Sequence, residues 1–485
     1  MRPPCTRSLL LLCPFLLFFF VVSSASAQNF VYTDNNTFPT NSVTAFSVAA
    51  NGALTNIGTF LTGGSGNVLG QGAPNRARIC AARNRLYVSN DWSGDVSGFE
   101  INPMTGALSL IPGSPFSAGG VGVSGMSLDC TPNGQFLIAA NAASNNIAVF
   151  GIDAIGALTP IPGSPFPAGG SKPDSVRVSP NGRFLSVALV DNDAVAMFGI
   201  GLNGALTQAP GSPFASPANG AVSAVDINCA GNLLYAVQAS DGANVDAFSI
   251  GSNGALTLVQ TFNNSAADDN SNVCVLSPND QFLFVSSRLS NSVNVFSVAP
   301  NGTLSLIPDS PFGGTGGEPF GLATDAGGTI LFTANFDNST VTSFSIAGNG
   351  ALSPVGAFST GQRDFSGLLS LAVFPGKGCS KAFDICLQDD STPGLLLRFN
   401  SVTGDYLFTK CGPKGFALSG KGSVSRMTVC TIDLRDSRMD RFVTASFNQC
   451  QRSGTASLQI NGTFTTTTYP ITDRKTVDDS CACSP

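Results

Sequence analysis

The chain of 485 residues contains no histidine. Histidine is the side chain whose ordinary pKa lies nearest neutrality, so catalytic proton transfer here would need a carboxylate instead. Its absence also argues against a zinc site, because none of the 13 cysteines belongs to a C-x-x-C pair that would supply the other ligands. We therefore expect no metal and no cofactor.

Charged residues are also scarce, at 11% of the chain, whereas hydrophobic residues make up 43%. Material for a core is ample, and Asn, Ser, Thr and Gly must cover much of the surface. Acids outnumber bases in residues 28–376, and bases outnumber acids in residues 377–485. The acidic larger part would repel phosphate, which argues against a nucleic-acid partner.

Long hydrophobic runs are missing after residue 22. The first 27 residues combine Arg2 and Arg7, an apolar run over Leu9–Val22 and a small-residue end, Ala25-Ser26-Ala27. This pattern predicts a secretory signal peptide cleaved before Gln28. A membrane anchor is the alternative, but the run is shorter than the roughly 20 residues that a spanning helix needs. We expect a secreted protein, extracellular or periplasmic, with no transmembrane segment after cleavage.

Cysteines concentrate in the last part of the chain. In an exported protein this density predicts a disulfide framework for a small domain, residues 377–485, without fixing the pairs. Gly and Asn turns between short strand signals predict a Cys-rich β sandwich or barrel there. Cys80 and Cys130, which lie earlier, are expected to be buried thiols. The C-terminal cysteines are Cys379, Cys386, Cys411, Cys430, Cys450, Cys481 and Cys483.

A repeated sequence motif runs through residues 28–376: Val or Ile, two residues, Phe, one residue, Ile or Val, a short turn, and then Gly-Ala-Leu or a near equivalent. Self-similarity at a period of about 50 residues is typical of a radial array of β units. Each period holds four strand signals separated by turn residues, which predicts the four-stranded blade of an all-β, seven-bladed β-propeller. The motif centres on Phe46, Phe99, Phe150, Phe198, Phe248, Phe296 and Phe344.

The first copy of the repeat begins out of phase. Phe30-Val31-Tyr32 matches the second strand of a blade, so the inner strand of that blade is missing at the start. An extra inner-strand segment stands at Leu368–Phe374. We predict that it completes the first blade and closes the ring, which removes the unpaired edges of a partial ring.

The phrase Pro-Gly-Ser-Pro-Phe recurs, first at Pro112–Phe116. Proline cannot donate to a strand ladder, so we place the phrase after an outer strand, with its Phe anchoring the connection to the next blade.

Together, the Asn-Gly-Ala-Leu and Ser-Pro-Asn-Gly phrases resemble those of the lactonase-type seven-bladed propellers, which include 6-phosphogluconolactonases, muconate-type cycloisomerases and related surface propellers. The resemblance covers residues 28–376 and implies a site on the loops around the central channel. Family enzymes tend to have Pro-His just before an inner strand. The matching pairs here are Pro74-Asn75, Pro173-Asp174 and Pro319-Phe320, without histidine.

Five residues are candidates for the site. Asp174 or Glu318 would replace the histidine as base near the channel mouth. Alignment of the Pro-x pairs puts Arg78 and Arg177 at one inner-strand position, with Asp129 there in the copy between, so two guanidiniums would clamp an anionic ligand. The alternative is that these arginines satisfy buried strand ends or pair with Asp129.

Two functions are consistent with the sequence. The first is a secreted, non-catalytic propeller that binds a small anionic ligand, a glycan or a protein partner at the channel mouth, with the C-terminal domain as an adaptor. The second is a lactone hydrolase or cycloisomerase. We expect a monomer in either case. The single tryptophan, Trp92, is placed to stack on a sugar ring, but one residue does not make a binding platform.

Overall fold

The computed structural model describes residues 29–66, 79–82, 84–119, 125–217, 220–239, 244–263, 271–361 and 370–374, with 81–82 and 271–272 as backbone only. It also describes the backbone of nine strands between residues 384 and 472. The predicted signal peptide and the domain boundary at 376/377 lie outside these residues and stay predictions. The described residues contain no helix with the length and apolarity needed to span a bilayer.

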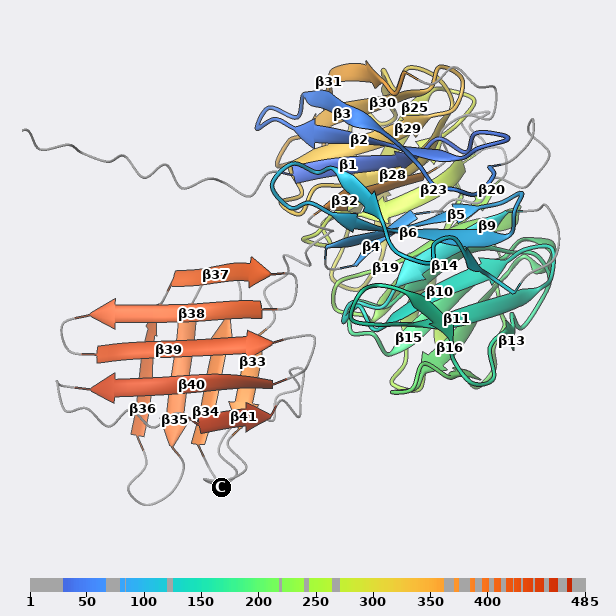
Figure 1. Cartoon of the computed structure of the whole chain (residues 1–485). Helices are drawn as coiled ribbons and strands as arrows, with labels where there is room; N and C mark the ends of the chain where they lie inside the picture. Colours follow the sequence, from blue (N-terminus) through green and yellow to red (C-terminus); the bar gives the residue numbers. More distant parts are fainter. Residues whose placement is uncertain are drawn as a thin grey trace, which may run out of the picture.

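The predicted seven-bladed β-propeller is confirmed (Figure 1). Each blade is an antiparallel sheet of four strands, which run from the channel outward in chain order except in blade 1, where the innermost strand comes last in the chain. From inner to outer strand the blades are β32 (Ser370–Phe374), β1 (Asn29–Asp34), β2 (Ser42–Val48), β3 (Leu54–Leu61); β4 (Ile79–Ala82), β5 (Arg85–Asn90), β6 (Asp95–Ile101), β7 (Leu108–Leu110); β9 (Met126–Cys130), β10 (Phe136–Asn141), β11 (Asn146–Ile152), β12 (Leu158–Pro160); β14 (Pro173–Val178), β15 (Phe184–Leu189), β16 (Ala194–Ile200), β17 (Leu206–Gln208); β19 (Ala221–Ile227), β20 (Leu233–Ala239), β21 (Val245–Ile250), β22 (Leu256–Phe262); β23 (Ser271–Leu276), β24 (Phe282–Ser287), β25 (Ser292–Val298), β26 (Leu304–Leu306); and β28 (Pro319–Thr324), β29 (Ile330–Asn335), β30 (Thr340–Ile346), β31 (Leu352–Ser359). These are blades 1 to 7.

The ring closes as predicted. β32 is the inner strand of blade 1 and pairs with β1, with Val373 opposite Val31. The two ends of the propeller therefore share one sheet, and no inner strand is left without a partner strand.

The repeated phenylalanines build the junctions between blades. All seven lie on the third strand of their blade and are almost completely buried, for example Phe46 and Phe344. Apolar side chains of neighbouring blades pack together at every junction of the ring. The repeat thus encodes packing between blades, which is the main favourable term in such a fold.

The Pro-Gly-Ser-Pro-Phe phrase anchors the connection between blades, as predicted. In blade 2, the hydroxyl of Ser114 accepts a hydrogen bond from the Gly98 amide at 2.9 Å, and Phe116 pairs with Val96 of the third strand. The same arrangement recurs in blades 3, 4 and 6, giving the short strands β8 (Phe116–Ser117), β13 (Phe166–Pro167), β18 (Phe214–Ala215) and β27 (Phe312–Gly313).

The C-terminal strands are also all β. They form one antiparallel sheet in the order β36-β35-β34-β33-β41-β40-β39-β38-β37, and Figure 1 shows β33–β36 crossing β37–β41, as two layers. The cysteine side chains of this part lie outside the described residues, so its predicted disulfides stay predictions. The strands are β33 (Asp384–Gln388), β34 (Leu395–Asn400), β35 (Asp405–Lys410), β36 (Phe416–Lys421), β37 (Ser423–Thr428), β38 (Thr431–Arg438), β39 (Arg441–Asn448), β40 (Ser453–Ile460) and β41 (Tyr469–Thr472).

The expectation of free thiols at Cys80 and Cys130 is wrong. These residues form a disulfide between the inner strands of blades 2 and 3, with their Cα atoms 6.0 Å apart. Cys229 is also disulfide-bonded. Cys274 is buried, and its Sγ donates to the Tyr235 carbonyl at 4.0 Å.

Candidate functional site

The channel has two chemically different ends. At the loop end, the inner strands begin, and the turns between second and third strands lie beside them because adjacent strands are antiparallel. At the hairpin end, the inner strands finish in tight turns to the second strands. Glu318 and Asp174 lie at the loop end, since Glu318 precedes Pro319 of β28 and Asp174 follows Pro173 of β14. Arg177 and Asp129 are each the last residue but one of their strands, at the hairpin end.

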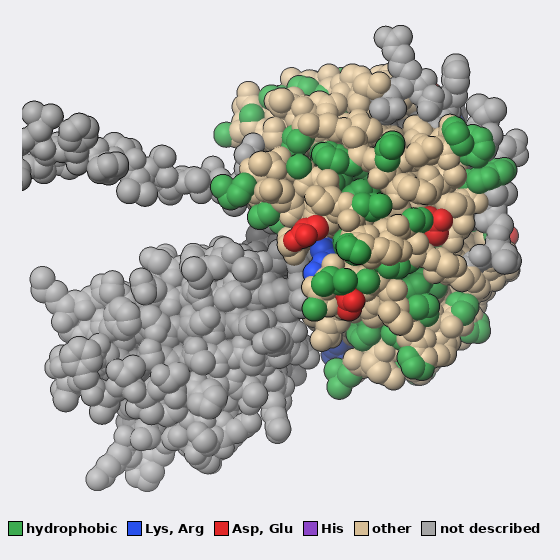
Figure 2. Space-filling view, in the orientation of Figure 1, with side chains coloured by type: hydrophobic (Ala, Val, Ile, Leu, Met, Phe, Trp, Pro, Cys, Tyr) green, Lys and Arg blue, Asp and Glu red, His purple; other side chains and the backbone are tan. Residues whose placement is uncertain are grey.

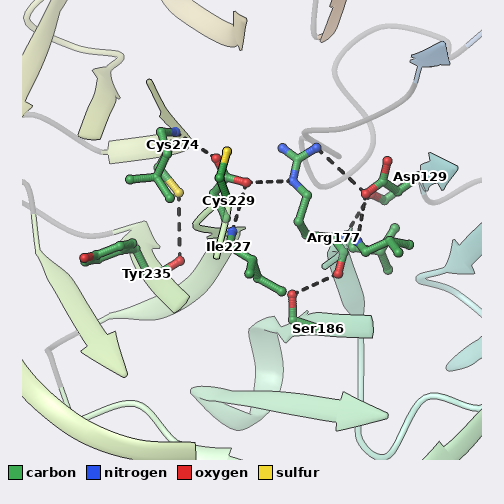
Figure 3. Close-up of polar contacts among 12 residues, drawn as sticks. Asp129, Arg177, Ser186, Ile227, Cys229, Tyr235 and Cys274 are labelled. Atoms are coloured by element: carbon green, nitrogen blue, oxygen red, sulfur yellow. Dashed lines mark hydrogen bonds and ion pairs between the residues drawn. The ribbon is translucent and has the colours of Figure 1, made fainter. Parts of the chain in front are cut away.

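Arg177 lies between two carboxylates from the neighbouring blades (Figure 3). Its Nε is 3.1 Å from Oδ1 of Asp226 in blade 5, and its Nη1 is 3.9 Å from Oδ2 of Asp129 in blade 3. Both acids also accept backbone hydrogen bonds, Asp129 from Val178 at 2.8 Å and Asp226 from Leu276 at 2.7 Å. The guanidinium therefore joins three consecutive blades.

One inner-strand position links successive blades through three kinds of bond. Cys80, Asp129, Arg177 and Asp226 occupy this position, because each pairs with the equivalent residue of its second strand. Each side chain bonds the next blade: by a disulfide, by a hydrogen bond to a backbone amide, by an ion pair, and again by a hydrogen bond. The sequence also predicts, as the alternative, that Arg177 pairs with Asp129, and the structure shows this pair.

Burial and neighbouring charges shift the pKa values of Asp129 and Arg177. Burial raises the pKa of Asp129, although Arg177 and the amides of Val178 and Cys130 lower it in part. Burial lowers the pKa of Arg177, but the charges of Asp226 and Asp129 outweigh this, and its pKa is raised. The cation is therefore fixed and already neutralised by its neighbours, which weakens its attraction for a ligand anion.

Arg78 lies outside the described residues, and the strand pairing corrects its alignment. Ala81 lies opposite Leu86, whereas Cys130 lies opposite Leu137, so the hairpin turn of blade 2 is shorter than that of blade 3. Cys80, not Arg78, therefore occupies the position of Arg177 in blade 2.

Glu318 forms a bidentate ion pair at the loop end. Arg288, from the turn between β24 and β25, donates from Nε to Oε2 at 2.8 Å and from Nη2 to Oε1 at 3.3 Å. The ring of Phe320 lies 5.0 Å from the guanidinium carbon. The side chain of Glu318 keeps 20% of its surface exposed, so the carboxylate is held in one orientation and still meets solvent.

Lys172 occupies in blade 4 the place that Glu318 occupies in blade 7. Each precedes the proline that begins its inner strand, and each has a left-handed backbone, with φ of +53° and +38°. Each donates its amide to an Asn side chain at 2.6 Å, Asn145 for Lys172 and Asn291 for Glu318. Strained non-glycine residues of this kind cluster at functional sites. A lysine and a glutamate thus occupy equivalent backbone positions three blades apart.

Asp174 is much less accessible than Glu318. It is 1% exposed and sits at a β-bulge in β14, between Pro173 and Ser175. The structure does not bring Asp174 or Glu318 to Arg177, since they lie at opposite ends of the inner strands. Among the described residues, no group of three acids or cysteines is placed to hold a metal ion.

Sequence reasoning missed Arg288 and Lys172. The signal for Lys172 was present, because Lys172-Pro173 and Glu318-Pro319 align as residue-plus-proline pairs. In the family enzymes the expected histidine follows the proline. Here the charged residue with the strained backbone precedes the proline. Arg288 has no such signal, since its role arises from the turn that carries it toward the next blade.

Comparison with known proteins gives the family. The family described as "Lactonase, 7-bladed beta-propeller" matches residues 21–124, 81–223 and 230–363. Similar solved structures include a putative 6-phosphogluconolactonase from Bacteroides fragilis, with 22% identity, a TM-score of 0.57 and coverage of 72% of this chain and 99% of that one. The periplasmic gluconolactonase PpgL from Pseudomonas aeruginosa has 18% identity, a TM-score of 0.59 and the same coverage.

At these identities the solved structures show the fold alone. No curated protein matches the chain significantly. The family match extends over most of the propeller, and the observed blades and closure agree with it. The chain therefore belongs to the lactonase family of seven-bladed β-propellers.

Proposed function

We propose that the chain is a lactone hydrolase that acts on an anionic sugar-acid lactone, similar to 6-phosphogluconolactonase, at the loop end of the channel. The family match supports the reaction class. The observation that carries the proposal is Glu318, a partly exposed carboxylate held by Arg288 on a strained backbone.

In the proposed reaction Glu318 replaces the missing histidine. Its carboxylate accepts a proton from a water molecule while the water oxygen bonds to the lactone carbonyl carbon. The ring C–O bond then breaks, and the departing ring oxygen takes the proton from Glu318, which leaves a hydroxy acid. Arg288 uses Nε and Nη2 to orient Glu318. In this scheme its Nη1 donates to the developing oxyanion.

Lys172 supplies the proposed contact with the anionic group of the substrate. Lys172 lies at the loop end in blade 4, three blades from Glu318 in blade 7. Asp174 is a weaker candidate for the base because it is buried. Arg177 and Asp129, at the other end, are assigned to holding the blades together.

A non-catalytic binding protein is the second candidate. The absence of histidine favours it, as does the neutralisation of Arg177 by Asp129 and Asp226. In this case the loop end binds a ligand without turning it over, and the C-terminal domain serves as an adaptor.

Export of the protein is part of the proposal. The signal pattern of residues 1–27 predicts it, and the Cys80–Cys130 disulfide supports it, because such bonds persist in oxidising compartments.

The test is turnover of a panel of lactones by the purified mature chain, followed as acid release at constant pH. The panel contains 6-phosphogluconolactone, gluconolactone and uncharged aliphatic lactones. We expect turnover of the phosphorylated lactone, and a fall in kcat/KM of about 100-fold or more in Glu318→Gln.

Asp337→Asn is the matched control, since Asp337 is an exposed carboxylate in the same blade and at the same end. It should leave kcat/KM unchanged. No turnover of any lactone would favour the binding protein, and turnover unaffected by Glu318→Gln would overturn the assigned base.

A further inference from the structure

Two exposed aromatic side chains meet at the loop end. Phe38 is 43% exposed and Trp92 is 46% exposed, and no other aromatic side chain of the described residues belongs to the exposed large hydrophobic ones. Their ring centroids are 5.4 Å apart, with an edge-to-face angle of 73°. The other exposed large side chains are aliphatic. Figure 2 shows how sparse charged groups are on one face of the propeller, where polar neutral surface and scattered hydrophobic groups predominate.

The two rings are held in place by hydrogen bonds between three loops. The amide of Trp92 donates to the carbonyl of Ser65 at 3.1 Å, and the hydroxyl of Ser65 donates to the carbonyl of Pro39 at 2.5 Å. On its other side, the loop is tied to blade 3, because Asp91 accepts from the Met126 amide at 3.1 Å. The rings are therefore positioned before any ligand arrives, which lowers the entropic cost of binding.

The aromatic pair belongs to the two blades that follow Arg288 and Glu318 around the ring. Phe38 lies in the β1–β2 turn of blade 1, and Trp92 in the β5–β6 turn of blade 2. Arg288 and Glu318 belong to blades 6 and 7, so the four side chains come from consecutive blades at one end.

We propose that Phe38 and Trp92 form a stacking surface for the pyranose ring of a carbohydrate. An aromatic face packs on the C–H face of a sugar, while the hydroxyl groups need polar neighbours, here the loops of Ser65 and Ser93. Asp91, next to Trp92 in the sequence, is 3% exposed and bonded to the Met126 amide, so its charge is withdrawn from the surface that a neutral sugar would meet. This proposal stands apart from lactone hydrolysis, because it concerns binding alone.

The single tryptophan makes the test direct, since all tryptophan emission of the chain comes from Trp92. Fluorescence of the full mature chain is titrated with soluble hexasaccharides of glucose, N-acetylglucosamine, xylose and mannose. Sedimentation with insoluble cellulose and chitin distinguishes polymer binding from binding of free oligosaccharide. We expect a saturable emission change with at least one hexasaccharide.

Calorimetric titration of variants then assigns the surface. Trp92→Ala should weaken binding by about tenfold or more through lost apolar contact, and Trp92→Phe should restore part of it. Phe38→Ala should weaken it similarly, whereas Leu202→Ala, at an exposed aliphatic residue elsewhere, should not.

Three results would overturn the proposal. One is no saturable emission change with any sugar, and another is unchanged affinity in Trp92→Ala. The third is an emission shift that depends on protein concentration without sugar, which would make the pair a contact between copies of the chain. Thermal melting of each variant shows that the loops still fold.

Discussion

Replacement of Asp226 tests whether Asp129, Arg177 and Asp226, the charged side chains at the hairpin end, stabilise the fold. In Asp226→Ala, the buried amide of Leu276 loses its acceptor, which costs about 1–3 kcal/mol. Arg177 also loses its partner at 3.1 Å and keeps only Asp129 at 3.9 Å. Loss of one partner of a fully buried pair costs about 3–5 kcal/mol, but Arg177 is 32% exposed and solvent compensates part of this. We expect a total loss of about 3 kcal/mol in the free energy of unfolding.

Asp226→Asn separates the hydrogen bond from the charge. Its amide oxygen still accepts from Leu276, but the ion pair and the hydrogen bond from the Ile227 amide to Oδ1 are lost, and we expect a smaller loss of about 2 kcal/mol. Equilibrium urea denaturation followed by circular dichroism measures both values. Asp191→Ala, at an exposed aspartate, is the control and should have no measurable effect. An Asp226→Ala variant as stable as the wild type, or an Asn variant as destabilised as the Ala variant, would show that Asp226 does not have this structural role.

Three further predictions concern the same framework. Joint replacement of Cys80 and Cys130 by alanine, which opens a loop with a sequence separation of 50, should lower the free energy of unfolding by about 4 kcal/mol; a reductant should then affect the wild type more than the variant. Burial raises the pKa of Asp129 in the folded protein, so its contribution to stability is full below the ordinary value of about 4 and is lost as pH rises through the raised pKa. The stability difference between wild type and Asp129→Asn should therefore fall over that window, and a rise would contradict the assignment. Non-reducing peptide mapping should link Cys229 to a cysteine within residues 379–483, and recovery of Cys229 as a free thiol would disprove this.

The fold was largely predictable because the repeat encodes packing. The phenylalanine of each copy is buried on a third strand, and its spacing counts the blades. Closure was predictable as well, since Phe30-Val31-Tyr32 begins on a second strand and only Leu368–Phe374 offers the missing inner strand. Both features are local patterns that depend on strand alternation.

The site was less predictable because it depends on register and on turns. The short hairpin of blade 2 shifts Cys80 into the position of Asp129, and so the disulfide to Cys130 could not be read from an alignment of phrases. Likewise, Arg288 reaches Glu318 from another blade, a contact of the closed ring rather than of any segment.

We assign the chemistry of this protein to the loop end of the channel and its structural contacts to the hairpin end. The most direct test compares Glu318→Gln with Arg177→Gln, by kcat/KM on 6-phosphogluconolactone and by urea denaturation of the same samples. We expect Glu318→Gln to lose activity at nearly unchanged stability, whereas Arg177→Gln should lose stability and keep its activity when folded. The opposite result, an inactive but stable Arg177→Gln protein beside an active Glu318→Gln protein, would contradict this assignment.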